Sequence, residues 1–325
     1  MTDDAPDVLV LREGTEGLST EPYARKLHER LPEFEVRRAR TPGEERELVA
    51  DARVVTGVRI DEELLDRAER LELFACAFAG TDHLPMDALR ERGIAVTNAG
   101  GIHAPGIAEG ALGNMLVFAR RLHEGWRRKQ NREWRHFQSG ELTGSTVTIV
   151  GLGSIGQALV RRLEGMAVET IGVRYSPEKG GPTDEVIGFE EERLHDALAR
   201  TEYLVIACPL TETTRGLIGE AEFATLPPEA VVINAARGPI IDTDALVNAI
   251  QFNAVRGAAL DVTDPEPLPP DHVLWGFENV LITPHTGGHT PRHWDRLAEI
   301  VADNVERLEG TDSFDDLENL VFTPG

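Results

Sequence analysis

The chain has few lysines and few cysteines, and it has no long apolar segment. Only three of its 33 basic residues are lysines, and 56 acidic residues bring the formal net charge to −23. A surface this acidic disfavours binding to the phosphates of nucleic acids. In molar salt the screening length falls to about 3 Å, so the repulsion between these charges largely disappears. We interpret the composition as adaptation to a salty cytoplasm, as in a halophile. An acidic protein of a mesophile is the alternative.

The two cysteines, Cys76 and Cys208, are too few for a disulfide framework or a metal-ligand set. Both lie in apolar, strand-like runs, which favours small buried side chains. No run of about 18 apolar residues is present, so the sequence predicts no membrane span. The acidic start, MTDDAPDVLVLREG, lacks the basic and apolar regions of a secretory signal. We therefore expect a cytoplasmic protein that binds neither nucleic acid nor membrane.

A length of 325 residues suggests two domains, since domains average roughly 150 residues. In the first hundred residues short apolar runs alternate with helical patterns, which predicts a parallel α/β sheet. The expected strands are 8–11, 34–36, 53–55, 71–75 and 94–96, with helices beginning near residues 21, 43, 61 and 85. A second series of strands and helices opens at residues 145–150 and ends with a helical pattern from Trp294 to Leu308.

Two further features lie between these series. The recurrence of Ile107, Ala111, Met115, Ala119 and Leu122 predicts one long amphipathic helix. The segment RRLHEGWRRKQNREW that follows is the one strongly basic stretch of an acidic chain. It forms either a solvated face or a surface that packs against an acidic partner subunit.

A glycine-rich loop predicts a dinucleotide site. TVTIVGLGSIGQALVRRL places Gly151, Gly153 and Gly156 between an apolar strand and a helix, as the G-x-G-x-x-G pattern requires. The first glycine permits a tight turn, the second lets the pyrophosphate approach, and the third lets the helix pack closely. The helix N-terminus, which begins with Ser154 and Ile155, adds N–H donors for the phosphates.

The next strand ends in IGVRYSP, where many dinucleotide sites have a carboxylate that binds the ribose hydroxyls. This chain has Arg174, Tyr175 and Ser176 instead. A guanidinium can bind a 2′-phosphate with paired, charge-assisted hydrogen bonds. We expect NADP(H) to be preferred, with NAD(H) possible if Arg174 only stacks on adenine.

Four polar side chains follow later strands, at the edge where ligands of parallel sheets bind. They are Arg237, Asp261, Glu266 and His285. Arg237 can hold the carboxylate of a 2-keto acid by a two-point contact. His285 can donate a proton to the carbonyl oxygen as hydride arrives at carbon, and a carboxylate such as Glu266 beside it favours the charged imidazole.

These stretches resemble the D-isomer-specific 2-hydroxyacid dehydrogenase family. The matching segments are GLGSIG, CPLTETTRGLI, INAARGPIIDTDAL, ALDVTDPEPLP and ITPHTGG. The resemblance implies that Arg237 binds substrate, that Glu266 and His285 form the acid–base pair, and that Asp261 contacts the nicotinamide carboxamide. It also implies that the backbone at Ala79 and Gly80 receives the substrate carboxylate. Further implied cofactor contacts are Cys208, Pro209, Thr214, Ala235, His285 and Gly288.

The resemblance also implies the architecture and the assembly. We expect two doubly wound parallel-sheet domains, with a Rossmann-type cofactor domain (99–290) inserted into a flavodoxin-like substrate domain (1–98 and 291–325). A homodimer would form through the cofactor domain. Substrate selectivity would come from residues 11–14, 56–59 and 78–82, where Arg12 or Arg59 can admit a second anionic group. Apolar Leu11, Val58 and Phe78 equally favour aliphatic 2-keto acids.

Two other functions stay open from the sequence. A dinucleotide-sensing regulatory protein, resembling a corepressor, can share the same scaffold and even the same catalytic residues. An oxidoreductase of formate or phosphite is the second alternative, although formate oxidation needs no acid–base pair. No metal site is expected, because His289 and His293 have helical spacing but Pro291 lies between them and no zinc-site glutamate follows His289.

Overall fold

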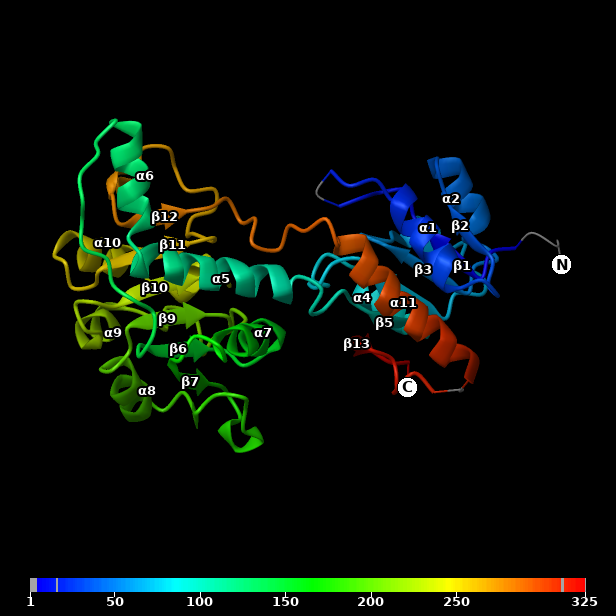
Figure 1. Cartoon of the computed structure of the whole chain (residues 1–325). Helices are drawn as coiled ribbons and strands as arrows, with labels where there is room; N and C mark the ends of the chain where they lie inside the picture. Colours follow the sequence, from blue (N-terminus) through cyan, green and yellow to red (C-terminus); the bar gives the residue numbers. More distant parts are fainter. Residues whose placement is uncertain (1–4, 16, 311–312, 325) are drawn as a thin grey trace. The chain divides into compact units, whose positions relative to one another are not determined.

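The computed structural model describes residues 5–15, 17–310 and 313–324 (Figure 1). The chain divides into two compact units, one made of residues 1–102 and 289–325 and the other of residues 103–288. The boundaries expected from the sequence, at 98/99 and 290/291, lie within four residues of these divisions.

The first unit contains a six-stranded sheet in the order β13-β5-β4-β3-β1-β2. Strands β1 to β5 are parallel, in the strand order of flavodoxin-like folds, and β13 pairs antiparallel with β5. The sequence did not predict β13, which is short and follows a polar segment. The strands are β1 Val8–Val10, β2 Val36–Arg38, β3 Val54–Gly57, β4 Leu73–Cys76, β5 Ala95–Thr97 and β13 Leu320–Phe322.

Helices cover both faces of this sheet. Successive side chains of a strand point to opposite faces, so Leu73 and Ala75 join one core while Phe74 and Cys76 join the other. Helices α1 (Glu21–Arg30) and α11 (His293–Gly310) pack together over the first face, where Tyr23 stacks on Trp294 with ring centroids 4.8 Å apart. The opposite core takes side chains from α2 Pro42–Leu48, α3 Glu62–Leu65 and α4 Met86–Glu91.

The second unit contains seven parallel strands in the order β12-β11-β10-β9-β6-β7-β8. The chain runs outward from β6 in both directions, which is the doubly wound order of dinucleotide-binding folds. The predicted α/β class and the two parallel-sheet units are confirmed. The strands are β6 Thr146–Val150, β7 Glu169–Val173, β8 Glu185–Ile187, β9 Tyr203–Ile206, β10 Val231–Asn234, β11 Gly257–Leu260 and β12 Val280–Ile282.

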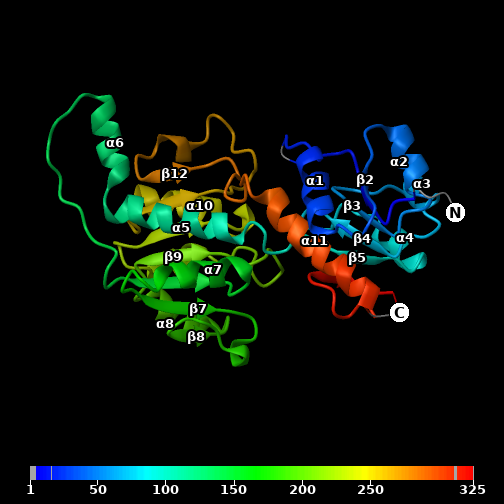
Figure 2. The same cartoon turned by 45° about the vertical axis from the view of Figure 1, so that its right-hand side comes forward.

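Helices again lie on both faces of the second sheet (Figures 1 and 2). On one face α5 (Ala104–Ala119) packs against α7 (Ser154–Leu163). The other face carries α8 Glu191–Leu198, α9 Glu220–Thr225 and α10 Thr243–Gln251. Three 3₁₀ turns, η1 Pro177–Lys179, η2 Gly238–Ile240 and η3 Val273–Gly276, lie in the loops of this unit.

The prediction of a single long helix from Ile107 to Leu122 is wrong at its end. Helix α5 stops at Ala119, and Leu122 begins a separate helix, α6 (Leu122–Gln130). Arg121 separates them with a left-handed backbone conformation (φ 51°), which an α-helix cannot contain. Leu122 is 53% exposed, so its place in the apolar repeat did not reflect a buried face.

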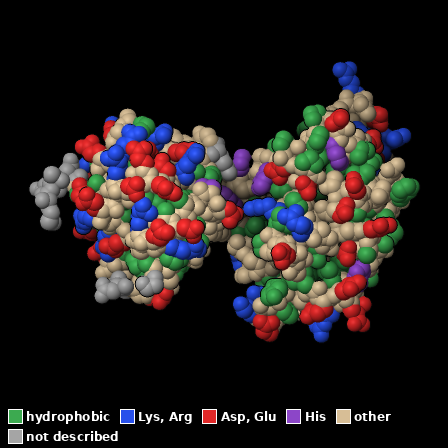
Figure 3. All heavy atoms as spheres, turned by 180° about the vertical axis from the view of Figure 1, so that it is seen from behind, with side chains coloured by type: hydrophobic (Ala, Val, Ile, Leu, Met, Phe, Trp, Pro, Cys, Tyr) green, Lys and Arg blue, Asp and Glu red, His purple; other side chains and the backbone are tan. Residues whose placement is uncertain are grey.

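The surface charge is distributed over both units. Acidic and basic side chains are interspersed on the face drawn in Figure 3. Several arginines are paired with carboxylates, including Arg53 with Glu72 and Arg200 with Glu169. Within the described part of the chain, no helix combines the length and apolar character needed to cross a bilayer.

Candidate functional site

The carboxyl ends of the second unit's strands form one edge of the sheet, and the candidate residues follow them in spatial order. His285 follows β12, Asp261 follows β11, and Arg237 lies beyond the end of β10. Gly151 follows β6 at the centre of the sheet, and Arg174 follows β7 on its other side. A dinucleotide laid along this edge would therefore meet the acid–base candidates at one end and the cation at the other.

The glycine loop has the geometry that a pyrophosphate site needs. Gly151 has φ 105°, and a Cβ there would lie 2.7 Å from the backbone of Ala207. A Cβ on Gly156 would lie 2.0 Å from the carbonyl oxygen of Gly151, so the helix can approach this closely only because the residue is glycine. At Gly153, by contrast, a Cβ would meet no atom within 4 Å. The space beside the α7 N-terminus, where Ser154 and Ile155 begin the helix, is open for an anion.

Arg174 lies half-buried directly after β7, and its conformation is fixed by the loop that follows. Its Nη1 donates a hydrogen bond of 2.6 Å to the carbonyl oxygen of Gly180. Tyr175 is 83% exposed, and Ser176 precedes the η1 turn. The guanidinium is thus oriented by backbone and not by a carboxylate.

The loop after β9 is ordered by a threonine. Buried Thr214 donates to the carbonyl oxygen of Pro209 at 2.7 Å and accepts from the backbone N–H of Thr211 at 2.8 Å. Cys208 is buried beside the glycine turn, and burial raises the pKa of its thiol to about 11. Cys208 and Thr214 therefore shape the loop, and the thiol stays neutral at ordinary pH.

The Arg237 segment packs tightly on the loop that carries Glu266. A Cβ on Gly238 would lie 1.9 Å from the carbonyl oxygen of Thr263, so the two backbones meet where only glycine fits. The side chain of Asn234 holds the turn by accepting from Ala236 N–H at 3.1 Å and donating to the Arg237 carbonyl at 3.0 Å. Arg237 itself is exposed, while Ala235 before it is half-buried.

Glu266 and His285 form the pair that the sequence suggested. His285 Nδ1 and Glu266 Oε1 are 2.7 Å apart, with side chains 48% and 42% exposed. Both residues line a cavity of about 350 Å³ together with Asp261 and Trp275. Because Nδ1 is engaged by the carboxylate, Nε2 is the ring nitrogen left to face a substrate.

Asp261 anchors the loop that carries His285. Its Oδ1 accepts from Thr283 Oγ1 at 2.5 Å and from Thr286 N–H at 3.0 Å, and its Oδ2 accepts from Gly287 N–H at 2.8 Å. His285 has φ 52°, a conformation that costs a non-glycine residue free energy and persists only when its surroundings impose it. A carboxylate can accept about four hydrogen bonds, so one position stays available for the expected carboxamide contact.

Several supporting residues were not identified from the sequence. Thr243 Oγ1 donates to the Asp264 carbonyl, and Thr263 Oγ1 donates to that of Pro265, each at 2.9 Å. The indole N–H of Trp275 donates to the Pro269 carbonyl at 2.9 Å. Together these bonds hold the loop around Glu266. Their only signal in the sequence is a set of hydroxyls and a tryptophan close to a proline-rich stretch.

The remaining candidates lie elsewhere in their own units. Ala79 and Gly80 are exposed in the loop after β4 of the first unit, where the Asn98 side chain donates to the Ala79 carbonyl at 2.6 Å. Gly288 ends the second unit, and a Cβ there would lie 3.2 Å from the His103 ring. Among the residues that the structure describes, no three His, Cys, Asp or Glu side chains are grouped so as to hold a metal ion.

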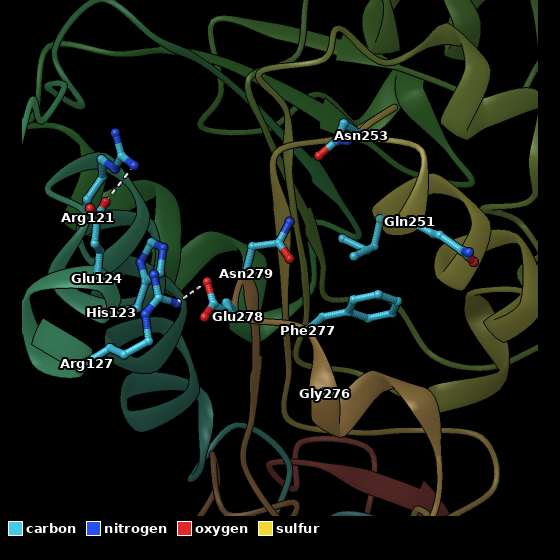
Figure 4. A pocket seen from close by; sticks show the side chains of 11 residues that line it. Arg121, His123, Glu124, Arg127, Gln251, Asn253, Gly276, Phe277, Glu278 and Asn279 are labelled. Atoms are coloured by element: carbon cyan, nitrogen blue, oxygen red, sulfur yellow. Dashed lines mark ion pairs between the residues drawn. The ribbon is translucent and has the colours of Figure 1, made fainter. Parts of the chain in front are cut away.

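A separate cavity of about 460 Å³ lies beside α6, at residues that precede β11 and β12 (Figure 4). Its charged side chains pair with one another: Arg121 with Glu124 at 2.5 Å, and Arg127 with Glu278 at 2.7 Å. Three arginines of the basic segment are therefore paired with carboxylates of this chain, since Arg128 also pairs with Glu124. The same segment also exposes two large apolar side chains, Trp126 at 64% and Trp134 at 97% exposure.

The sequence and the fold are similar to those of known proteins. Residues 112–287 match the NAD binding domain of the D-isomer specific 2-hydroxyacid dehydrogenases. The chain is 36% identical to a glyoxylate reductase of Thermofilum pendens over 254 residues, which cover 76% of this chain and 74% of that protein. A crystal structure of a Thermus thermophilus protein is similar with a TM-score of 0.71 and 32% identity, over 97% of this chain and all of that one.

A third relative is longer than this chain. The chain is 32% identical to a D-3-phosphoglycerate dehydrogenase of Methanocaldococcus jannaschii over 289 residues, which cover 87% of this chain. The aligned part spans 55% of that enzyme's length.

Proposed function

Because the chain belongs to the D-isomer specific 2-hydroxyacid dehydrogenase family, we propose that it interconverts 2-keto acids and D-2-hydroxy acids with a nicotinamide dinucleotide. The observation that carries the proposal is the 2.7 Å contact between His285 and Glu266, on the same sheet edge as the open glycine loop. An acid–base pair beside a hydride carrier is what reduction of a carbonyl requires.

The bound nicotinamide would supply or accept the hydride. His285 donates the proton to the carbonyl oxygen from Nε2 during reduction and removes it during oxidation. Glu266 orients the ring through Nδ1 and stabilises the imidazolium. Arg237 binds the substrate carboxylate and polarises the neighbouring carbonyl. Asp261 contacts the carboxamide while holding the loop of His285.

The two units would bind different molecules. The second unit, which carries the family's NAD binding domain, would hold the cofactor through the glycine loop and the loops after β9 and β10. The first unit would bind substrate, with the backbone at Ala79 and Gly80 receiving its carboxylate.

We propose NADP(H) as the preferred form of the cofactor. The first residue after β7 is a half-buried arginine whose guanidinium is oriented by the Gly180 carbonyl. A carboxylate at this position would repel a 2′-phosphate, whereas Arg174 attracts it. Arg174→Gln should raise the KM for NADPH at least tenfold and change that for NADH little. Equal increases in the KM for NADPH and for NADH would indicate that Arg174 contacts the adenine and not the 2′-phosphate.

We also propose a homodimer through the second unit. The exposed tryptophans Trp126 and Trp134 lie in the segment around α6, and large exposed apolar side chains of this kind mark protein contacts. Trp134→Ser should lower the mass measured by light scattering toward that of one chain. If Trp134→Ser remains a dimer, the interface lies elsewhere. If the wild-type protein is a monomer, the proposed dimer is refuted.

The test of the main proposal is reduction of a panel of 2-keto acids at molar KCl, with NADPH and NADH side by side. Turnover of a 2-keto acid to the D-hydroxy acid is the expected result. A folded protein that binds dinucleotide but reduces none of the panel would refute the proposal and favour the dinucleotide-sensing alternative.

A further inference from the structure

Two arginines lie at the carboxyl edge of the first sheet, near the loop proposed to receive the substrate carboxylate. Arg12 lies just past β1 and Arg59 just past β3, and the strand order makes β1, β3 and β4 neighbours. The loops after β3 and β4 also touch, because His83 Nε2 lies 2.7 Å from the carbonyl oxygen of Val58. Arg59 therefore stands one strand away from Ala79.

Both arginines are already bound to carboxylates of this chain, but in different settings. Arg12 donates from its backbone N and its Nε to the buried Glu45, at 2.8 and 3.0 Å. Arg59 forms a two-point pair with Glu13, from Nε at 2.8 Å and from Nη2 at 2.5 Å. The side chains of Arg59 and Glu13 are 64% and 40% exposed. In the first pair Glu45 is buried, although the Arg12 side chain is 46% exposed, whereas in the second pair both side chains meet solvent and can meet a ligand.

Two of the three apolar residues expected to select the substrate do not reach this surface. Leu11 and Val58 are buried in the two cores of the first unit, at 2% and 7% exposure. Phe78 is only partly buried and stands against the His83 ring. Among the ion pairs of the described residues in the loops after β1 and β3, Glu13–Arg59 is thus the one in which both side chains are open to solvent.

We propose that Glu13 and Arg59 form a charge filter, which admits 2-keto acids with uncharged side chains and excludes those with a second anionic group. The inference rests on the proposed function and names its substrate class. Glu13 occupies Nε and Nη2 of Arg59. A second carboxylate would either displace Glu13 from this two-point position or bind the remaining donors beside it, and in both cases two like charges would lie close together. The net charge of −23 likewise repels a dianion more strongly than a monoanion.

Two substrates of matched shape test the filter. In 4-methyl-2-oxopentanoate the terminal group is an isopropyl, and in oxaloacetate a carboxylate of similar size takes its place. The ratio of kcat/KM for oxaloacetate to that for 4-methyl-2-oxopentanoate is measured at molar KCl. Chromatographic identification of malate excludes reduction of pyruvate formed from decomposed oxaloacetate.

Glu13→Gln keeps the shape of the pair and removes its negative charge, so Arg59 keeps an uncompensated positive charge. The ratio should rise at least tenfold, and Glu13→Gln combined with Arg59→Gln should return it to within about threefold of wild type. The matched control is Glu72→Gln, which breaks the 2.8 Å pair with Arg53 before β3 and β4, at the opposite edge of the same sheet. It changes the net charge equally and should leave the ratio unchanged.

The possible results test the charge filter and the proposed function separately. A wild-type ratio above one, or an unchanged ratio in Glu13→Gln, would overturn the filter while leaving the enzyme class intact. A rise that persists in the double variant would remove Arg59 from the explanation and overturn the filter as well. A wild-type protein that reduces neither compound nor any other 2-keto acid would refute the proposed function and the filter with it.

Discussion

Replacement of Asp261 by asparagine should reduce turnover by disordering the loop of His285. The carboxylate accepts three hydrogen bonds from residues 283–287, two at Oδ1 and one at Oδ2. Asparagine can keep the two at its carbonyl oxygen. Its amino group would then face the N–H of Gly287 at 2.8 Å, donor against donor.

The size of the effect follows from these contacts. A hydrogen bond to a charged group contributes about 1.5–3 kcal/mol, and a neutral acceptor is roughly half as strong. One lost bond and two weakened ones sum to about 3–6 kcal/mol, and water recovers about half of this because Asp261 is half-buried. His285 needs this support, since its left-handed conformation costs on the order of 1–3 kcal/mol. At 1.4 kcal/mol per factor of ten, we expect kcat to fall about 10- to 100-fold.

The assay compares steady-state kcat with the dissociation constant of the dinucleotide, measured by tryptophan fluorescence. Thr283→Val serves as a milder variant for comparison, because it removes one donor to Oδ1 of Asp261 and leaves the carboxylate unchanged. Its kcat should fall less than that of Asp261→Asn. If Asp261→Asn keeps kcat within twofold, or changes only the binding of the dinucleotide, Asp261 does not position His285 and the reasoning is refuted.

Three further results are expected. His285→Gln should lose at least about a hundredfold in kcat with little change in dinucleotide affinity, and retained turnover would remove His285 from the mechanism. The thermal midpoint should rise from low to molar KCl as screening relieves the repulsion of 56 acidic residues, whereas a flat response would contradict salt adaptation. Thiol reagents should label the native protein slowly below the raised pKa values of Cys76 and Cys208, each about 11, and quickly after unfolding; fast native labelling would show that these thiols are accessible.

The sequence predicted the fold well wherever periodicity reflects burial. Strands such as β9 are continuous apolar runs because both faces of a parallel sheet are covered. The same reasoning failed at Leu122, where an apolar residue continued the repeat of α5 across a left-handed residue. It also missed β13, since an edge strand of three residues has too few positions to show a pattern.

The sequence identifies candidate site residues but not the contacts that support them. Strand ends reveal Arg237 and His285, because polar residues directly after apolar runs stand out. The contact of Gly238 with Thr263 and the bonds from Asp261 to the His285 loop depend on which loops the sheet brings together. The Glu13–Arg59 pair is of the same kind, since its members are 46 residues apart. Such contacts carry no local sequence signal.

The strand order separates the residues to which we assign three parts of the proposed reaction. Arg174, the cation that we propose to bind the cofactor, follows β7. The proposed acid–base pair lies beyond β11 and β12, on the opposite side of the central β6. The charged pair that we propose for substrate choice belongs to the other unit altogether. Changes at Arg174, His285 and Glu13 share no contact partner in the described structure, so their effects on free energy should add. A variant that combines Arg174→Gln with Glu13→Gln should therefore show both altered preferences at the sizes measured singly, and a marked deviation would reveal coupling between the two units.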